Sequence, residues 1–286
     1  MTPDISIITV GMNHLSYVKE MLRSLYEEGK PACSFEMIYV DNCSTDGTCA
    51  YIAERYPEVK IIKNEEKYGF ARNNNIGAKH AQGRYILILN PDIVLTKGAI
   101  DQLYEYALSH PASGIVAPQL QNRDHSLQYS VRRFPSLKIL FNRIMTNGDD
   151  SSENHYVENY LQKNLPLSTP SEVDWCMGAA FLISRPFYNE LGGFDENFFL
   201  YVEDMDICYR CWQANKKVIY YPLAQMMHIH QRNSRHFNKR TWIHLKSFLY
   251  FFRKNRFKIH SYLQTEIHPN AYAEEVLATE AIVSNK

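Results

Sequence analysis

The sequence predicts an α/β protein with a doubly wound, mostly parallel sheet and helices at its C-terminal end. Short apolar, β-branched runs alternate with helical patterns from residue 5 to residue 118, and the connections between them are short. One of these runs, Tyr85 to Leu89, is apolar throughout, which is typical of a strand buried on both faces. Strand–helix alternation of this kind indicates a sheet covered by helices on both sides.

The spacing of the apolar residues gives the expected elements in order. Strands are expected at 5–10, 35–40, 59–62, 85–89, 114–118, 179–183 and 218–221. Helices are expected at 15–27, from Ser44 or Thr45 to about Tyr56, after Gly69, at 99–109, at 205–214 and from Lys239 onward. Residues 142–171 are polar without a sustained period, so we expect a loop insertion there. The chain thus divides into one large domain over 1–236 and a helical extension over 237–286.

The composition favours a cytoplasmic protein with reduced thiols. The chain has 286 residues, 45% of them hydrophobic, and no run approaches the ~18 apolar residues of a membrane span. Its N-terminus lacks the basic start and the small-residue cleavage pattern of a signal peptide. The six cysteines are scattered, and Cys208 and Cys211 lie within an expected helix, so neither a disulfide framework nor a zinc site is expected.

The formal net charge of zero hides an uneven distribution. Residues 207–265 contain twelve Lys and Arg and no Asp or Glu, which leaves 19 basic and 31 acidic residues for the rest of the chain. The helix expected from Lys239 places five apolar residues on one stripe among these cations: Trp242, Leu245, Leu249, Phe252 and Ile259. Such a helix favours contact with an anionic membrane surface over RNA, and packing against the chain's own domain is an equal alternative.

A nucleotide site is indicated by Asp41 and Asn42, which end the second expected strand. A carboxylate at the rim of a parallel sheet can accept the imide N–H of a uracil or thymine ring, and ligands of open α/β sheets bind at that rim. An Asx-turn explains residues 44–47 but not the position of Asp41. A dinucleotide fold is disfavoured, because Gly11-Met12-Asn13 lacks the G-x-G-x-x-G spacing.

A divalent cation site is indicated by Asp92, which follows the apolar strand ending at Leu89. Its carboxylate is a hard oxygen ligand, although Asn90-Pro91-Asp92 is also good turn chemistry. His228 and His230 follow a strand farther along, so either imidazole is a candidate second ligand. Arg232 and Arg235 come next and could contact phosphate.

A third cluster, Glu203-Asp204-Met205-Asp206, opens the helix expected at 205–214. Acids in a first helical turn complement the helix dipole, which is a sufficient structural explanation. However, the apolar residues Phe198 to Tyr201 precede them, and a carboxylate beside an apolar wall can act as a general base.

Taken in order, these motifs resemble glycosyltransferase family 2, and most closely its bacterial rhamnosyltransferase-like subgroup. The resemblance extends over about 5–235. It is carried by Asp41-Asn42, Ser44-Thr45-Asp46-Gly47, Gly69-Phe70-Ala71-Arg72-Asn73, Asn90-Pro91-Asp92, Trp175 to Ala179, Gly192-Gly193-Phe194-Asp195-Glu196 and Glu203-Asp204. It implies a GT-A fold, the nucleotide-diphospho-sugar transferase fold.

The resemblance also assigns roles by position. Asp204, with Glu203 beside it, would be the catalytic base of an inverting transfer, and Asp92 with His228 or His230 would bind Mg²⁺ or Mn²⁺. The residues implied to bind the nucleotide-sugar donor are Asp41, Asn42, Gly69, Arg72, Asn73, Asp92, Trp175, Gly178 and Arg232. Asn90 replaces the first acid of the family's DXD motif, which implies weaker metal binding.

The implied reaction moves a sugar from a nucleoside-diphosphate donor, dTDP-rhamnose or a UDP-hexose, to a hydroxyl of a glycan or lipid-linked glycan in cell-surface polysaccharide synthesis. We expect peripheral contact with the inner membrane surface and no nucleic-acid partner. Two alternatives remain at this point: a sugar-nucleotide nucleotidyltransferase, and a non-catalytic nucleotide- or carbohydrate-binding protein. The nucleotidyltransferase would need a Gly-rich, Arg-bearing loop that residues 11–15 do not supply.

Overall fold

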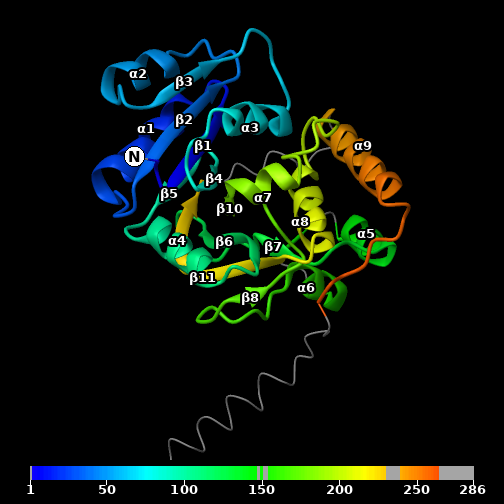
Figure 1. Cartoon of the computed structure of the whole chain (residues 1–286). Coiled ribbons are helices and arrows are strands. Elements are labelled where there is room, and N and C mark those ends of the chain that lie inside the picture. The colour runs from blue at the N-terminus through cyan, green and yellow to red at the C-terminus, as the bar shows by residue number, and fades with distance from the viewer. Residues whose placement is uncertain (1, 147–148, 151–153, 230–238, 264–286) are drawn as a thin grey trace, which may run out of the picture.

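A nine-stranded mixed sheet forms the centre of the computed structural model, which describes residues 2–146, 149–150, 154–229 and 239–263 (Figure 1). Along the sheet the strands run β3-β2-β1-β4-β10-β6-β11-β5, and β8 pairs with β11. Their bounds are Ile5–Gly11 (β1), Phe35–Asp41 (β2), Lys60–Lys63 (β3), Tyr85–Leu89 (β4), Ile93–Leu95 (β5), Ser113–Gln121 (β6), Ser171–Glu172 (β8), Ala180–Ser184 (β10) and Lys217–His228 (β11). A separate pair joins β7 (Val131–Arg132) to β9 (Trp175–Cys176).

Helices cover both faces of this sheet, as the sequence predicts. Their bounds are Leu15–Arg23 (α1), Thr48–Arg55 (α2), Phe70–Lys79 (α3), Ala99–Ser109 (α4), Leu137–Met145 (α5), His155–Leu161 (α6), Arg185–Glu190 (α7), Glu203–Gln213 (α8) and Lys239–Lys254 (α9), and a π-helical turn, Ser24–Glu28, extends α1. In β4, Ile86 and Ile88 enter the core beneath α3 and α8, whereas Leu87 and Leu89 enter the core beneath α1 and α4. Burial on both faces explains why this strand is apolar throughout.

The direction of β10 brings the segment before it to the edge of the sheet at which β1, β2 and β4 end. Strands β1 to β4 are mutually parallel, but β10 runs antiparallel to β4, with Ala180 opposite Leu89. The residues that lead into β10 therefore lie where β4 ends, which is the edge at which β1 and β2 also end. The predicted α/β fold is confirmed, with this antiparallel strand as an addition.

Residues 142–171 contain helix rather than the loop that the sequence suggested. The end of α5 and all of α6 fall in this stretch. Val157 and Leu161, spaced i and i+4, are fully buried beside Tyr160, and the Asn154 side chain accepts a hydrogen bond from the Tyr156 amide to cap the helix. One helical turn of apolar residues within a polar segment is too short to give a detectable hydrophobic periodicity in the sequence.

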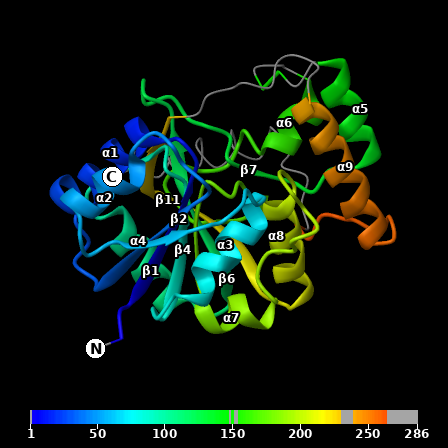
Figure 2. The same ribbon diagram turned by 90° about the horizontal axis from the view of Figure 1, so that it is seen from above.

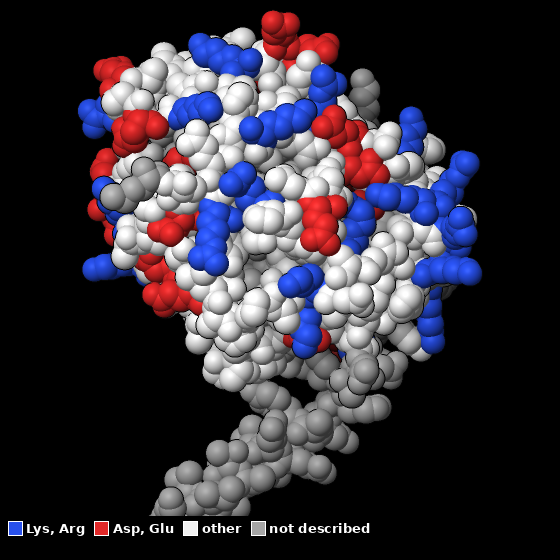
Figure 3. Space-filling model, viewed as in Figure 1, with Lys and Arg blue, Asp and Glu red and all other residues white. Residues whose placement is uncertain are grey.

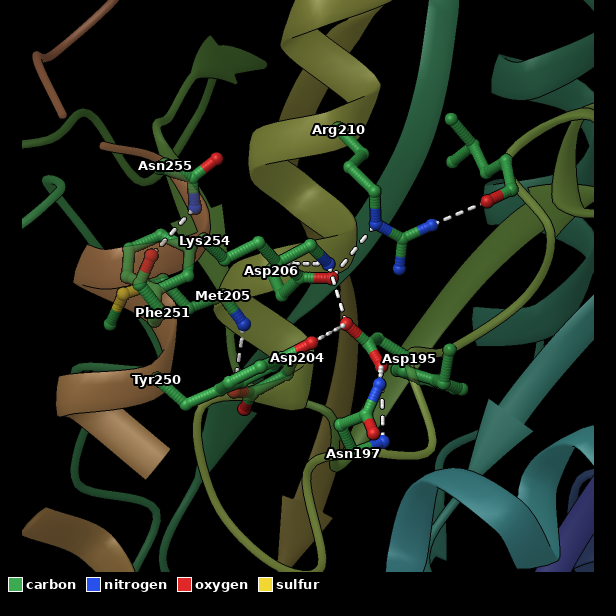
Figure 4. Close-up of polar contacts among 12 residues, drawn as sticks. Asp195, Asn197, Asp204, Met205, Asp206, Arg210, Tyr250, Phe251, Lys254 and Asn255 are labelled. Atoms are coloured by element: carbon green, nitrogen blue, oxygen red, sulfur yellow. Dashed lines mark hydrogen bonds and ion pairs between the residues drawn. The ribbon is translucent and has the colours of Figure 1, made fainter. Parts of the chain in front are cut away.

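Helix α9 is held to α8 by a partly buried network of charged side chains (Figure 4). The Lys254 ammonium lies 2.7 Å from carboxylate oxygens of both Asp195 and Asp206. The fully buried Asp206 carboxylate also accepts from Arg210 Nε at 2.8 Å. The buried Phe251 ring packs edge-on against Tyr209 of α8, 5.7 Å between centroids. Described residues of the C-terminal region therefore pack against the large domain.

The expected apolar stripe of α9 divides between two environments. Phe252 is buried, whereas Trp242, Leu245 and Leu249 are 58%, 49% and 52% exposed. Figure 1 and Figure 2 both place α9, α5 and α6 on the side of the molecule opposite α1 and α2. One face of α9 thus matches the packing alternative, and its outer face stays apolar in contact with solvent.

Candidate active site

Three parallel strands bring Asp41 and Asp92 to one edge of the sheet. Asp41 is the last residue of β2 and lies opposite Gly11, the last residue of β1. On the other side of β1 is β4, whose end leads through Asn90 and Pro91 to Asp92. The Thr9 hydroxyl donates to the Leu89 carbonyl at 2.8 Å, which fixes the end of β4 beside β1.

On the nucleotide side, two predicted residues shape the loop that leads into α3. The Asn42 amide donates to the Tyr68 carbonyl at 3.0 Å and accepts from the Tyr68 amide at 2.9 Å. The buried Asn73 amide donates to the carbonyls of Tyr68 and Gly69 at 3.1 and 3.0 Å. Both side chains thus hold the backbone of the loop in place through hydrogen bonds. Asp41 itself accepts from the Ser44 amide at 3.2 Å.

Gly69 and Arg72 lie where this loop meets the segment before α8. A Cβ at Gly69 would overlap the Phe199 backbone, and the Phe70 amide donates to the Phe199 carbonyl at 3.0 Å. Only glycine permits this close approach. The Arg72 guanidinium lies over the Tyr68 ring, 3.7 Å from its centroid.

Asp92 and His228 form the pair that could hold a cation. His228 Nε2 lies 3.5 Å from Asp92 Oδ2, and Asp92 Oδ1 is buried without a hydrogen-bond partner among the described residues. A carboxylate with one buried oxygen that lacks a partner, and a second oxygen near an imidazole nitrogen, fits a divalent ion with nitrogen and oxygen ligands. In the described part of the chain no three His, Cys, Asp or Glu side chains gather in a metal site. His230, Arg232 and Arg235 lie outside the described residues.

Gln128, which carries no sequence signal, holds His228 from behind. Its Nε2 donates to the His228 carbonyl at 2.8 Å, so its Oε1 must accept from His228 Nδ1, 2.9 Å away. This hydrogen bond assigns a proton to Nδ1, so that Nε2, the atom that faces Asp92, is the nitrogen available to bind a cation. Metal-binding histidines are commonly oriented by such a partner.

The catalytic candidates Glu203 and Asp204 open α8 and reach the same edge of the sheet. Asp204 Oδ2 accepts from the Gly178 amide at 2.9 Å. Gly178 adjoins Ala179, whose carbonyl accepts from the Asn90 amide at 2.8 Å, two residues before Asp92. A short series of backbone contacts thus connects the Asp204 carboxylate to the predicted cation site.

The turn before these acids is strained. Tyr201 and Val202 have φ angles of 70° and 73°, in the left-handed region. That conformation is unfavourable for bulky and β-branched residues, and strain of this kind is concentrated at functional sites. It turns the chain abruptly from exposed Phe199 into α8, which directs Asp204 toward Gly178.

Burial and mutual repulsion separate the roles of the two adjacent acids. Burial, and then the Asp204 charge, raise the pKa of Glu203 to about 8. Burial also raises the pKa of Asp204, but the amides of Gly178 and Met205 and the Arg132 guanidinium oppose that rise. We therefore assign the proton at neutral pH to Glu203 and the charge to Asp204.

Trp175 supports the site from one side. Its buried indole donates from Nε1 to the Arg133 carbonyl at 2.9 Å, and its ring faces the Arg132 guanidinium at 5.4 Å. Arg132, like Gln128, lies in a segment that no motif singled out. Its one sequence signal is the pair of arginines, Arg132 and Arg133, inside an otherwise apolar and small-residue stretch.

Strand order, helix placement and a ligand edge lined by acids define the GT-A class of α/β transferases. The model for Glycosyl transferase family 2 matches residues 6–192. This chain belongs to glycosyltransferase family 2, which confirms the resemblance seen in its motifs.

Two curated relatives are rhamnosyltransferases. N-acetylglucosaminyl-diphospho-decaprenol L-rhamnosyltransferase of Mycobacterium tuberculosis is 30% identical over 241 residues, covering 80% of this chain and 76% of that protein. Rhamnosyltransferase WbbL of Escherichia coli K12 is 29% identical over 258 residues, covering 87% of this chain and 92% of that protein.

Two solved structures share the fold. GalNAc-T7 with UDP, GalNAc and Mn²⁺ aligns with a TM-score of 0.63 at 16% identity, covering 88% of this chain and 48% of its own, so this chain spans about half of its length. The mannosyltransferase PcManGT of Pyrobaculum calidifontis, in complex with GDP-Man and Mn²⁺, aligns with a TM-score of 0.63 at 18% identity, covering 91% of this chain and 66% of its own.

The raised pKa of Glu203 predicts a pH-dependent stability. The folded state favours the protonated acid, so the contribution of Glu203 to stability is complete below pH 4.5 and is lost as the pH rises through about 8. Glu203→Gln should therefore gain stability relative to the wild type between pH 5 and pH 9, by roughly 2–4 kcal/mol. Urea unfolding at both pH values measures this difference. Glu190→Gln, at an exposed site, controls for the loss of one charge, and an equal gain in both variants would contradict the assignment.

Proposed function

We propose that this protein is an inverting glycosyltransferase that uses a nucleoside-diphosphate sugar. The observation that carries the proposal is the link from Asp204 through Gly178 and Ala179 to Asn90 and Asp92. This link supports a base close to the diphosphate site, which a single-displacement transfer needs. No described feature favours a nucleotidyltransferase or a non-catalytic binding protein.

In this reaction Asp204 takes the proton from the attacking hydroxyl of the acceptor. Its two backbone hydrogen bonds fix the carboxylate, and protonated Glu203 leaves it as the charged member of the pair. The hydroxyl then attacks the anomeric carbon in line with the departing diphosphate, and the configuration at that carbon inverts. Positioning and fixed electrostatics supply most of the lowering of the barrier.

Asp41 accepts the imide N–H of a pyrimidine base, which makes dTDP-rhamnose or a UDP-hexose the proposed donor. The similarity to two rhamnosyltransferases supports the first of these. The proposed acceptor is a hydroxyl of a glycan or lipid-linked glycan in cell-surface polysaccharide synthesis. The name of the mycobacterial relative, which specifies a diphospho-decaprenol acceptor, supports a lipid-linked one.

Asp92 and His228 would hold a Mg²⁺ or Mn²⁺ ion, with Gln128 fixing the imidazole. When bound, the ion supplies positive charge that neutralises the leaving diphosphate. With Asn90 in place of an acid, the chain offers fewer anionic ligands, so we expect the ion to be shared with the diphosphate and to bind weakly without it.

Asp204→Asn tests the function directly. The amide keeps the shape of the side chain but cannot take the proton, so transfer should fall at least about 100-fold. Nucleoside-diphosphate affinity should stay within about twofold, because the base does not bind the nucleotide. Release of nucleoside diphosphate from donor and acceptor measures the first quantity, and calorimetry the second. Asp124→Asn, in an exposed turn, is the control; equal losses of transfer and affinity in Asp204→Asn would place the base elsewhere.

We also propose that the protein works at the cytoplasmic face of the membrane, with the 237–286 region as a contact extension of the 1–236 catalytic domain. Leu245 and Leu249 are exposed on α9, next to the exposed cations Lys246 and Arg253. Figure 3 shows Lys and Arg side chains gathered at the edge where α9 lies in Figure 1. No helix in the described ranges combines the length and hydropathy needed to cross a bilayer.

Replacing Leu245 and Leu249 together by Glu should reduce binding to vesicles that contain phosphatidylglycerol. The substitution removes two apolar contacts and adds charge of the same sign as the lipid, so binding should fall at least about tenfold. Co-sedimentation at low and high salt measures it. Leu223→Glu changes an exposed leucine outside α9 and serves as the control. Unchanged binding of the double variant would restrict α9 to its packing role.

A further inference from the structure

Arg132 carries a positive charge that no described side chain neutralises at close range. None of the ion pairs among the described residues includes it. Its Nε is buried and has no hydrogen-bond acceptor in that part of the chain. Asp150, the nearby acid of the α5–α6 connection, instead pairs with Arg143 at 2.8 Å. Burial opposes the charge of Arg132, and Tyr160 with the carboxylates of Asp150 and Asp204 favours it without a direct ion pair, so an anion bound at close range would stabilise the charge further.

Two aromatic rings fix the position of the Arg132 guanidinium. Its central carbon lies 5.4 Å from the Trp175 ring centroid and 5.7 Å from that of Tyr160. Arg132 pairs with Trp175 across the β7–β9 ladder, so the backbone on both sides of the contact is fixed. Contacts with aromatic faces hold a guanidinium in place without consuming its N–H donors. Tyr160 also accepts a hydrogen bond from the guanidinium, whereas Nε has no acceptor among the described residues. The side chain is therefore oriented in advance and keeps N–H donor capacity for a ligand.

The position of Arg132 relates it to the reaction. Its charge acts on the carboxylate of Asp204 and on the imidazole of His244 in α9. His244 in turn lies against Tyr201, 5.0 Å between ring centroids, in the strained turn that precedes Asp204. Arg132 thus belongs to the group of side chains around the proposed base, on the side formed by β7, β9, α6 and α9.

We propose that Arg132 is an anion-binding residue of the active site that receives a phosphate group beside Asp204. Arginine suits this ligand, because its planar fork matches two phosphate oxygens and its N–H groups make charge-assisted hydrogen bonds. The phosphate belongs either to the diphosphate of the donor or to a phosphorylated acceptor, which share the same chemistry. The link to catalysis rests on the function proposed above, whereas the anion site rests on the geometry of Arg132 alone.

Anion affinity of the full chain tests the proposal without turnover. Isothermal titration would measure the binding of UDP and dTDP to the free protein, and of inorganic pyrophosphate to protein saturated with the tighter nucleotide. Arg132→Met keeps the length and apolar stem of the side chain, and should weaken one of these affinities about tenfold or more. Arg132→Lys keeps the charge but loses the fork, and should lie between wild type and Arg132→Met. Arg143→Met, at a neighbouring arginine that has its own carboxylate, is the matched control.

The two titrations distinguish the source of the phosphate. Loss of nucleotide affinity assigns Arg132 to the donor diphosphate, whereas loss of pyrophosphate binding in the saturated protein assigns it to the acceptor. Folded Arg132→Met with both affinities unchanged would overturn the proposal. A change confined to the pH–rate profile of transfer would also overturn it, because Arg132 would then act only on the pKa of Asp204. A wild-type protein inactive toward nucleotide sugars would refute the transferase and leave the anion result standing.

Discussion

The hydrogen bond from the Gly178 amide to the Asp204 carboxylate connects the two halves of the proposed site. Gly178 leads into β10, and β10 is antiparallel to β4, so this amide lies at the edge where β4 ends. A Cβ at Gly178 would lie only 3.2 Å from the Asp204 Cβ, so the contact leaves little room for a larger residue. Asp204 belongs to α8, and an ion pair between buried Asp206 and Lys254 joins α8 to α9. The Gly178 amide therefore joins the edge of the sheet to the proposed base in α8, and through α8 to α9.

The parts of the fold that depend on local pattern could be predicted. The uninterrupted apolar run of β4 indicates a doubly covered strand because Ile88 and Leu89 face different cores. Asp41 and Asp92 could be placed at one edge because parallel strands end together. In the structure Asp41 ends β2 and Asp92 follows the end of β4, and these strands lie on either side of β1. The acids at this edge do not by themselves indicate a transferase, because an acid at a strand end also suits a turn. The family resemblance was needed for that inference.

The remaining features depend on contacts between distant segments, which local pattern does not record. Gln128 acts on His228, 100 residues away, and nothing near it in the sequence announces that partner. Strands β7 and β9 are two residues long and exist only through their pairing with each other. Valine strongly disfavours the left-handed conformation that Val202 adopts, so the sequence does not predict this turn. A residue that keeps an unfavourable conformation also suggests a functional constraint at that position.

We propose that carboxylates far apart in the chain serve one nucleotide-diphosphate site. Calorimetric titration of UDP, dTDP, GDP and ADP, with and without Mn²⁺, into the wild type and Asp92→Ala tests it most directly. We expect a pyrimidine diphosphate to bind most tightly, Mn²⁺ to strengthen that binding, and Asp92→Ala to remove the Mn²⁺ effect while leaving nucleoside binding unchanged. Equal affinity for all four nucleotides, or an Mn²⁺ effect that survives in Asp92→Ala, would show that these carboxylates do not serve such a site.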